Sequence, residues 1–141
     1  MTEKLFEKGL LKKAPGASTR VPKSLRIAAI YLGEARLSLK AEAFHMCLVA
    51  AYTCIFHSAR AFLFADGIAE RSHFAVYEYL KEKHAELGRR MLEGLNIFRQ
   101  MRHAALYELD AVVAEDDAKS AIEFAAEFLE EAKKKLGDIG S

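Results

Sequence analysis

Helix-breaking residues are concentrated near the start of this chain, and their scarcity afterwards is what most restricts its possible folds. The two prolines are Pro15 and Pro22, and strand-like alternation of polar and apolar residues is hard to find after them. Apolar residues recur instead at spacings of three and four, the period of a helix buried on one side. The sequence therefore predicts an all-α protein with helices over about residues 2–12, 22–40, 42–65, 74–84, 88–106 and 116–136.

The predicted helix over residues 42–65 is apolar on nearly every side, which is typical of a central, buried helix. Its small residues, which would let another helix or a second subunit approach closely, are Ala50, Ala51, Ala59 and Ala61. The chain has 141 residues, a length that suits one domain. We therefore expect a single domain over residues 1–141, built around this helix.

The overall charge excludes a strong field around the whole molecule. Lysine and arginine number 21 and aspartate and glutamate 20, which gives a net charge of +1. Binding to RNA or DNA would therefore need a local cationic patch. We expect no membrane span, because His45, His57 and Arg60 interrupt the most apolar stretch, Phe44–Ala65. The first residues lack the apolar core of a signal peptide, so we expect a cytoplasmic protein.

Several helix ends can be predicted from local chemistry. Asp66-Gly67 stops the central helix, and Ser72 is suited to cap the helix that follows. The last helix begins near acidic residues at Asp116-Asp117 and ends at the run Lys133–Lys135. This arrangement suits the helix dipole, and it explains the lysine run without a nucleic-acid patch.

A metal site is not predicted, although two Glu-x-x-His segments occur, Glu42–His45 and Glu70–His73. A di-metal helical bundle would also need a glutamate pointing inward from each of two further helices. The core stripes of helices 22–40 and 116–136 carry alanine, isoleucine and leucine instead. No Gly-x-Ser-x-Gly elbow and no glycine-rich phosphate loop occurs. We therefore predict no cofactor and expect any nucleotide to be bound by side chains.

The segment Asn96–Tyr107 is the best candidate for a functional site. On a helix, Arg99, Arg102, His103 and Tyr107 share one wedge, whereas Gly94, Ile97, Phe98, Met101 and Ala105 form an apolar seam on the other side. Arginine can bind a phosphate, and histidine can transfer a proton near neutral pH. Tyr107 could orient a ribose or donate a hydrogen bond. A solvated helix face without a ligand would have a similar composition and remains the alternative.

Nearly the whole chain resembles the HEPN superfamily, in particular its small prokaryotic branch. The landmarks are, in order, Gly9–Lys13 before a proline-containing loop, Ala35–Leu39, the central stretch Ala50–Leu63, Gly67 with Ser72-His73, and Met101–Tyr107. Their order and spacing carry the resemblance together. It implies an up-and-down bundle of five to six helices that forms a homodimer.

The resemblance also implies candidate activities. Active members of the superfamily are metal-independent RNases with an Arg-x(4–6)-His motif, and many small members pair with a minimal nucleotidyltransferase in toxin–antitoxin systems. Arg102 would take the arginine role and His103 the polar position after it, but Tyr107, Glu108 and Leu109 stand where the family histidine would be. The sequence therefore favours a protein that binds a nucleotide or RNA phosphate with Arg99, Arg102 and His103, on a face that the resemblance places in the dimer cleft. The alternative is an RNase toxin that uses Arg102, His103 and Tyr107, and a helical scaffold without a ligand is a third possibility.

Overall fold

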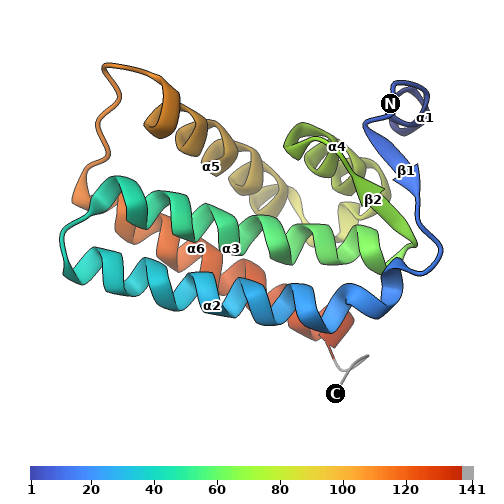
Figure 1. Cartoon of the computed structure of the whole chain (residues 1–141), viewed down its shortest axis with the longest axis horizontal. Coiled ribbons are helices and arrows are strands. Elements are labelled where there is room, and N and C mark those ends of the chain that lie inside the picture. The colour runs from blue at the N-terminus through green and yellow to red at the C-terminus, as the bar shows by residue number, and fades with distance from the viewer. Residues whose placement is uncertain (138–141) are drawn as a thin grey trace.

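The computed structural model describes residues 1–137 and confirms the all-α class (Figure 1). Its long helices α2, α3 and α6 pack along one another, α5 crosses above them, and the short elements gather at one end. The elements are α1 (Thr2–Glu7), β1 (Leu11–Lys13), the 3₁₀ turn η1 (Ala17–Arg20), α2 (Val21–Lys40), α3 (Phe44–Ala65), β2 (Ile68–Glu70), α4 (His73–Lys83), the 3₁₀ turn η2 (Ala85–Leu87), α5 (Arg89–Tyr107) and α6 (Glu115–Leu136).

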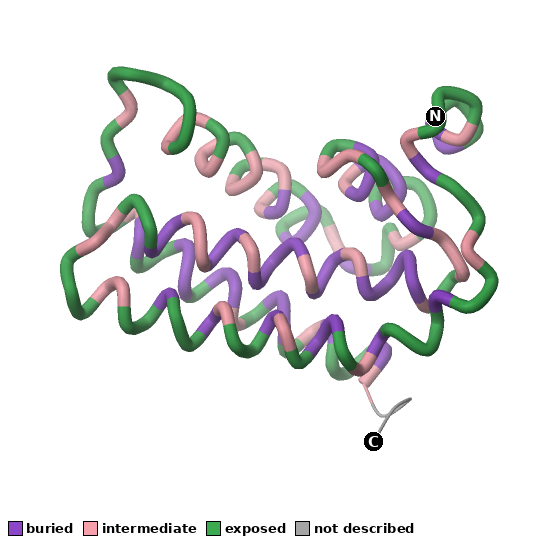
Figure 2. Tube along the Cα trace, viewed as in Figure 1, coloured by how far each residue is buried: buried purple, intermediate pink, exposed green. Residues whose placement is uncertain are grey.

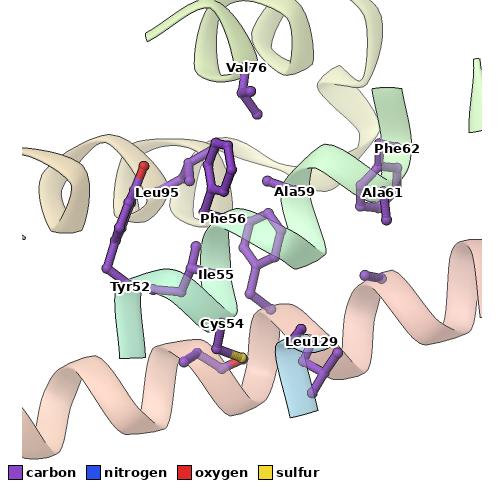
Figure 3. Packing of buried hydrophobic residues seen from close by; sticks show 14 of the residues in the cluster. Tyr52, Cys54, Ile55, Phe56, Ala59, Ala61, Phe62, Val76, Leu95 and Leu129 are labelled. Carbon is purple, nitrogen blue, oxygen red and sulfur yellow. The ribbon is translucent and has the colours of Figure 1, made fainter. Parts of the chain in front are cut away.

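The central position of α3 is confirmed (Figure 2). Its side chains face α2 and α6 on one side and α4 and α5 on the other, and Figure 3 shows part of this packing. Ala51, Ala59 and Ala61 are fully buried among these helices. The small residues therefore serve helix packing within one chain, and these three offer no surface to a second subunit.

Within residues 1–137, α3 is the one helix long and apolar enough to cross a membrane by length and composition. The polar residues within α3 therefore do not by themselves exclude a membrane span, contrary to the expectation from the sequence. However, 72% of its most apolar stretch is buried inside the protein, which is the environment of a core helix.

The predicted first helix over residues 2–12 is wrong in its second half. Helix α1 ends at Glu7, Gly9 adopts a positive φ of 75°, and the chain continues as the strand β1. This strand pairs antiparallel with β2, with Leu11 opposite Glu70 and Lys13 opposite Ile68. The strands are three residues each, too short to show alternation in the sequence, and the strand partner of the buried Leu11 lies almost sixty positions away.

The predicted helix ends are confirmed. The Ser72 hydroxyl accepts a hydrogen bond of 3.2 Å from the amide of Ala75 in the first turn of α4. At the start of α6, the Ala114 amide donates to the Asp117 carboxylate at 3.0 Å. The first turn of α6 is acidic and its last turn carries three lysines.

The apolar seam of α5 is only partly as expected. Gly94 allows α5 to approach the Phe124 ring of α6 so closely that a Cβ atom at this position would overlap the ring. Phe98, Met101 and Ala105 pack against the core, but Ile97 is 51% exposed. The helix is therefore anchored at its N-terminal half, where Met91, Leu92 and Leu95 are buried, and is less covered toward Tyr107.

We predict that Gly94→Ala destabilises the protein by roughly 1–3 kcal/mol, the usual cost of overpacking a core, because Phe124 must move. Gly33→Ala is the matched control: Gly33 lies in α2 with nothing near its missing Cβ, so alanine should stabilise by up to about 1 kcal/mol. Urea unfolding followed by circular dichroism measures both changes. Equal stability of the two variants would mean that the close approach of α5 and α6 is absent in solution.

Candidate functional site

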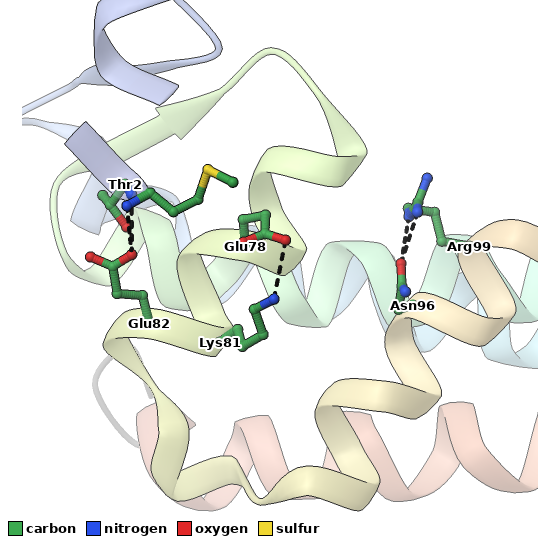
Figure 4. Close-up of polar contacts among 7 residues, drawn as sticks. Thr2, Glu78, Lys81, Glu82, Asn96 and Arg99 are labelled. Atoms are coloured by element: carbon green, nitrogen blue, oxygen red, sulfur yellow. Dashed lines mark hydrogen bonds and ion pairs between the residues drawn. The ribbon is translucent and has the colours of Figure 1, made fainter. Parts of the chain in front are cut away.

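Arg99 and Arg102 direct their guanidinium groups from α5 toward aromatic rings of α3 and α4. The Arg102 guanidinium carbon lies 5.9 Å from the centroid of the Tyr52 ring, and that of Arg99 lies 5.4 Å from the Phe74 centroid. Arg99 also donates two hydrogen bonds, of 3.0 and 2.8 Å, to the side-chain oxygen of Asn96 (Figure 4). Both arginines are half-buried, so these contacts restrict their orientation.

Neither arginine has an acidic partner in the part of the chain that the structure describes. The ion pairs found within residues 1–137 involve other cations, including Arg60 with Glu70 and Arg89 with Glu93. Asn96 is neutral and supplies a hydrogen-bond acceptor without cancelling charge. The Arg99/Arg102 pair therefore presents two positive charges that an anionic ligand can neutralise.

His73, the first residue of α4, completes this cluster from the opposite side. Its ring stacks on Phe56 at a centroid distance of 4.0 Å, and its Nδ1 atom lies 2.9 Å from the Tyr52 hydroxyl in a hydrogen bond. Tyr52 and Phe56 are buried residues of α3 that project toward α4 and α5 (Figure 3). Helices α3, α4 and α5 therefore meet at one cluster of rings and cations.

The imidazole of His73 is neutral at physiological pH. Burial, together with the nearby cations Arg102, Arg60 and Arg99 and with His57, lowers its pKa to about 4. Burial raises the pKa of Tyr52, so its hydroxyl keeps its proton. The two groups thus form a neutral hydrogen-bonded pair beneath the arginines, and His73 adds no charge to the site.

His103 and Tyr107, which were predicted to share a face with the arginines, lie on the exposed part of α5. Their rings are 4.8 Å apart, and Tyr107 is 66% exposed. The structure thus brings Arg99 and Arg102 together with Tyr52 and His73, and leaves His103 beside them at the surface.

Sequence reasoning missed Tyr52 and His73 as parts of this site. As a site residue, His73 was considered only for a metal site with Glu70, but Glu70 binds Arg60 in a two-point ion pair, with hydrogen bonds of 3.0 and 3.2 Å. Within residues 1–137, no group of histidine, cysteine and carboxylate side chains has the arrangement of a metal site. A usable signal was present in Ser72-His73, since the predicted cap at Ser72 places His73 at the first position of a helix.

A family model described as the HEPN domain matches residues 21–136, most of the chain from the start of α2 to the end of α6. No curated protein matches this sequence.

The lowered pKa of His73 predicts a loss of stability in mild acid. Between pH 6.5 and about 4 the unfolded chain binds a proton at this histidine more readily than the folded protein, so the free energy of unfolding falls as pH falls. The contribution is on the order of 2 kcal/mol between pH 7 and pH 4. Replacing His73 by asparagine should remove this part of the pH dependence.

The measurement is urea unfolding of wild type and His73→Asn at pH 7, 5.5 and 4. His103→Asn is the control, because His103 is exposed and should leave the pH dependence as in wild type. If His73→Asn and wild type lose stability in parallel between pH 7 and pH 4, the buried neutral histidine is refuted.

Proposed function

Because this chain belongs to the HEPN family, we propose that it binds a phosphate of RNA or of a nucleotide at the Arg99/Arg102 pair, with His103 and Tyr107 at its edge. RNA or nucleotide binding is a general property of HEPN domains, which also commonly dimerise. The proposal for this chain concerns which residues do so, and through which chemistry.

One observation supports these residues above all others: the two half-buried guanidinium groups have no acidic partner within residues 1–137. Placing two cations close together is unfavourable unless an anion or water compensates them. Asn96 and the rings of Tyr52 and Phe74 fix their positions before a ligand arrives. Such preorganisation lowers the entropy lost on binding and suits a phosphate, which accepts several charge-assisted hydrogen bonds.

A metal-independent RNase is the second candidate, and the exposure of His103 next to Arg102 favours it. The ribose 2′-oxygen would attack the phosphorus and the 5′-oxygen would leave; Arg102 would stabilise the negative charge of the phosphorane, while His103 would either remove the proton of the 2′-hydroxyl or protonate the leaving 5′-oxygen. Binding without cleavage is the stronger candidate, because no histidine in the chain follows an arginine at the family spacing. His73 does not replace it, since its ring stacks on the buried Phe56 and its Nδ1 atom is hydrogen-bonded to the Tyr52 hydroxyl.

The proposed setting is a cytoplasmic toxin–antitoxin-type system in which a minimal nucleotidyltransferase is the partner. This setting is supported by the resemblance of the chain to the small prokaryotic branch of the HEPN superfamily, which is carried by Ala50–Leu63 and Met101–Tyr107. The exposed Tyr107 and His103 would be accessible to such a partner.

The second subunit of the proposed homodimer would bind the α2–α3 face. Leu37 is 65% exposed there, and Ile30 and Met46 are also exposed large apolar residues. Leu37 and Met46 line a groove of about 400 Å³ that reaches Thr53, the neighbour of Tyr52 in α3.

We predict that Arg102→Gln weakens the binding of a single-stranded oligoribonucleotide about tenfold, the equivalent of about 1.4 kcal/mol for one lost charge-assisted contact. The slope of log affinity against log salt should fall by about 0.7, the value for one phosphate of a single strand. Fluorescence anisotropy at several salt concentrations measures both. Arg89→Gln is the control, because Arg89 lies on the same helix and is paired with Glu93.

The same oligonucleotide distinguishes binding from cleavage. Cleavage in the presence of a chelator, lost in His103→Ala, would establish the RNase candidate instead of binding alone. Wild-type affinity in a variant that lacks both Arg99 and Arg102 would refute this phosphate site.

For the dimer, we predict that Leu37→Glu yields a monomer in sedimentation equilibrium at micromolar concentration, because a buried unpaired carboxylate would oppose association. Ile97→Glu is the matched control, since Ile97 is an exposed apolar residue of α5 on a different surface. A monomeric wild type would refute the dimer, and dissociation by Ile97→Glu alone would refute its placement on α2–α3.

A further inference from the structure

A second cationic pocket, of about 290 Å³, lies between η1, α2 and α3, outside the site described above. Arg20 and Lys23 come from the junction of η1 and α2, and His57 and Arg60 come from α3. Ser24, Ile27 and Phe64 complete the lining. Neither the predicted site residues nor the proposed phosphate site includes any of these side chains.

The charge of this pocket is positive and only partly compensated. Its lining contains three cations and no carboxylate. Arg60 shares its charge with Glu70, whereas Arg20 and Lys23 are in no ion pair found within residues 1–137. A cavity lined by uncompensated cations binds anions, and its size is sufficient for a phosphate group with its attached sugar.

Aromatic rings support the cations of this pocket as they do at the first site. Phe64 lies beneath both arginines, with centroid distances of 5.6 Å to Arg20 and 5.0 Å to Arg60. His57 stacks on Tyr31 with its ring nearly parallel, at 11°. These contacts fix the walls of the pocket before any ligand binds.

The two sites are joined by a continuous row of contacts. From Arg60 the row passes to Phe56 at 5.1 Å, from Phe56 to His73 at 4.0 Å, and from His73 to Tyr52, which lies beneath Arg102. Tyr52, Phe56, Arg60 and Phe64 are spaced four residues apart along α3. This row is about 18 Å long at 1.5 Å per residue, or about five nucleotides at the stacked rise of roughly 3.4 Å.

We infer that the Arg20/Lys23/Arg60 pocket is a second phosphate site, which binds another phosphate of the same single-stranded RNA that occupies the Arg99/Arg102 pair. This inference rests on the proposed function and extends it from one phosphate to an extended strand. Tyr52, Phe56 and Phe64 are buried, so they orient the cations and do not stack on bases. The strand is recognised through its backbone, and binding depends on length more than on sequence.

The test compares a trinucleotide with a decanucleotide of the same single-stranded RNA, each labelled with fluorescein. The double variant Arg20→Gln/Lys23→Gln should bind the decanucleotide about tenfold more weakly and with a salt slope reduced by about 0.7, because one phosphate contact is lost. It should bind the trinucleotide as wild type does, since that ligand is too short to span both sites. Arg26→Gln/Lys40→Gln is the matched control, with one arginine and one lysine removed from exposed positions of α2.

Each outcome separates the inference from the proposed function. If the Arg20/Lys23 variant binds the decanucleotide like wild type while Arg102→Gln weakens both ligands, the second site is wrong and the first stands. The second site is also wrong if the Arg20/Lys23 variant weakens the binding of both ligands equally, or if the Arg26/Lys40 control weakens decanucleotide binding as much as the Arg20/Lys23 variant does. In either case the loss reflects the overall charge of the protein. If Arg102→Gln changes neither ligand, the proposed phosphate site itself fails.

Discussion

The burial of α3 is the constraint on which the rest of this structure depends. A helix that is apolar on nearly every side must be covered on every side, so α2 and α6 occupy one flank and α4 and α5 the other. Its hydroxyl groups bond within the helix: Thr53 donates to the carbonyl of Val49 at 2.8 Å, and Ser58 donates to that of Cys54 at 2.9 Å. The Tyr52 hydroxyl instead needs a partner from outside the helix, and His73 supplies it.

This arrangement also explains how positive charge can be concentrated beside a core. The guanidinium groups of Arg102, Arg60 and Arg20 lie over rings that belong to α3, and those of Arg102 and Arg20 have no acidic partner within residues 1–137. Arg102, Arg60 and Arg99 act electrostatically on His73, whose neutral state removes one further charge from a crowded region. The protein has almost no net charge, yet it gathers these cations along one row. A phosphate backbone would complement such a row.

Local sequence signals were sufficient for most helix boundaries. The cap at Ser72, the stop at Asp66-Gly67 and the acidic and basic ends of α6 each act within a few residues, so they can be recognised without the fold. The strand at Leu11 could not be recognised in this way, because its stability comes from pairing with Glu70 across the chain. The predicted burial of Ile97 was wrong for a related reason. Helical periodicity assigns Ile97 to the apolar seam, but no neighbouring element within residues 1–137 covers its side chain, which is largely exposed.

By itself, the sequence determined the fold class, the central helix and the presence of Arg99 and Arg102 on one side of a helix, because these follow from the period of the apolar residues. Only the tertiary structure decided what those arginines face. Tyr52, His73 and Arg60 are far from Arg102 in the chain, and the packing of α4 and α5 on α3 brings them into one row. Helical periodicity fixes the direction in which a side chain points from the axis of its helix. The residues of other helices that this side chain contacts depend on how the helices pack.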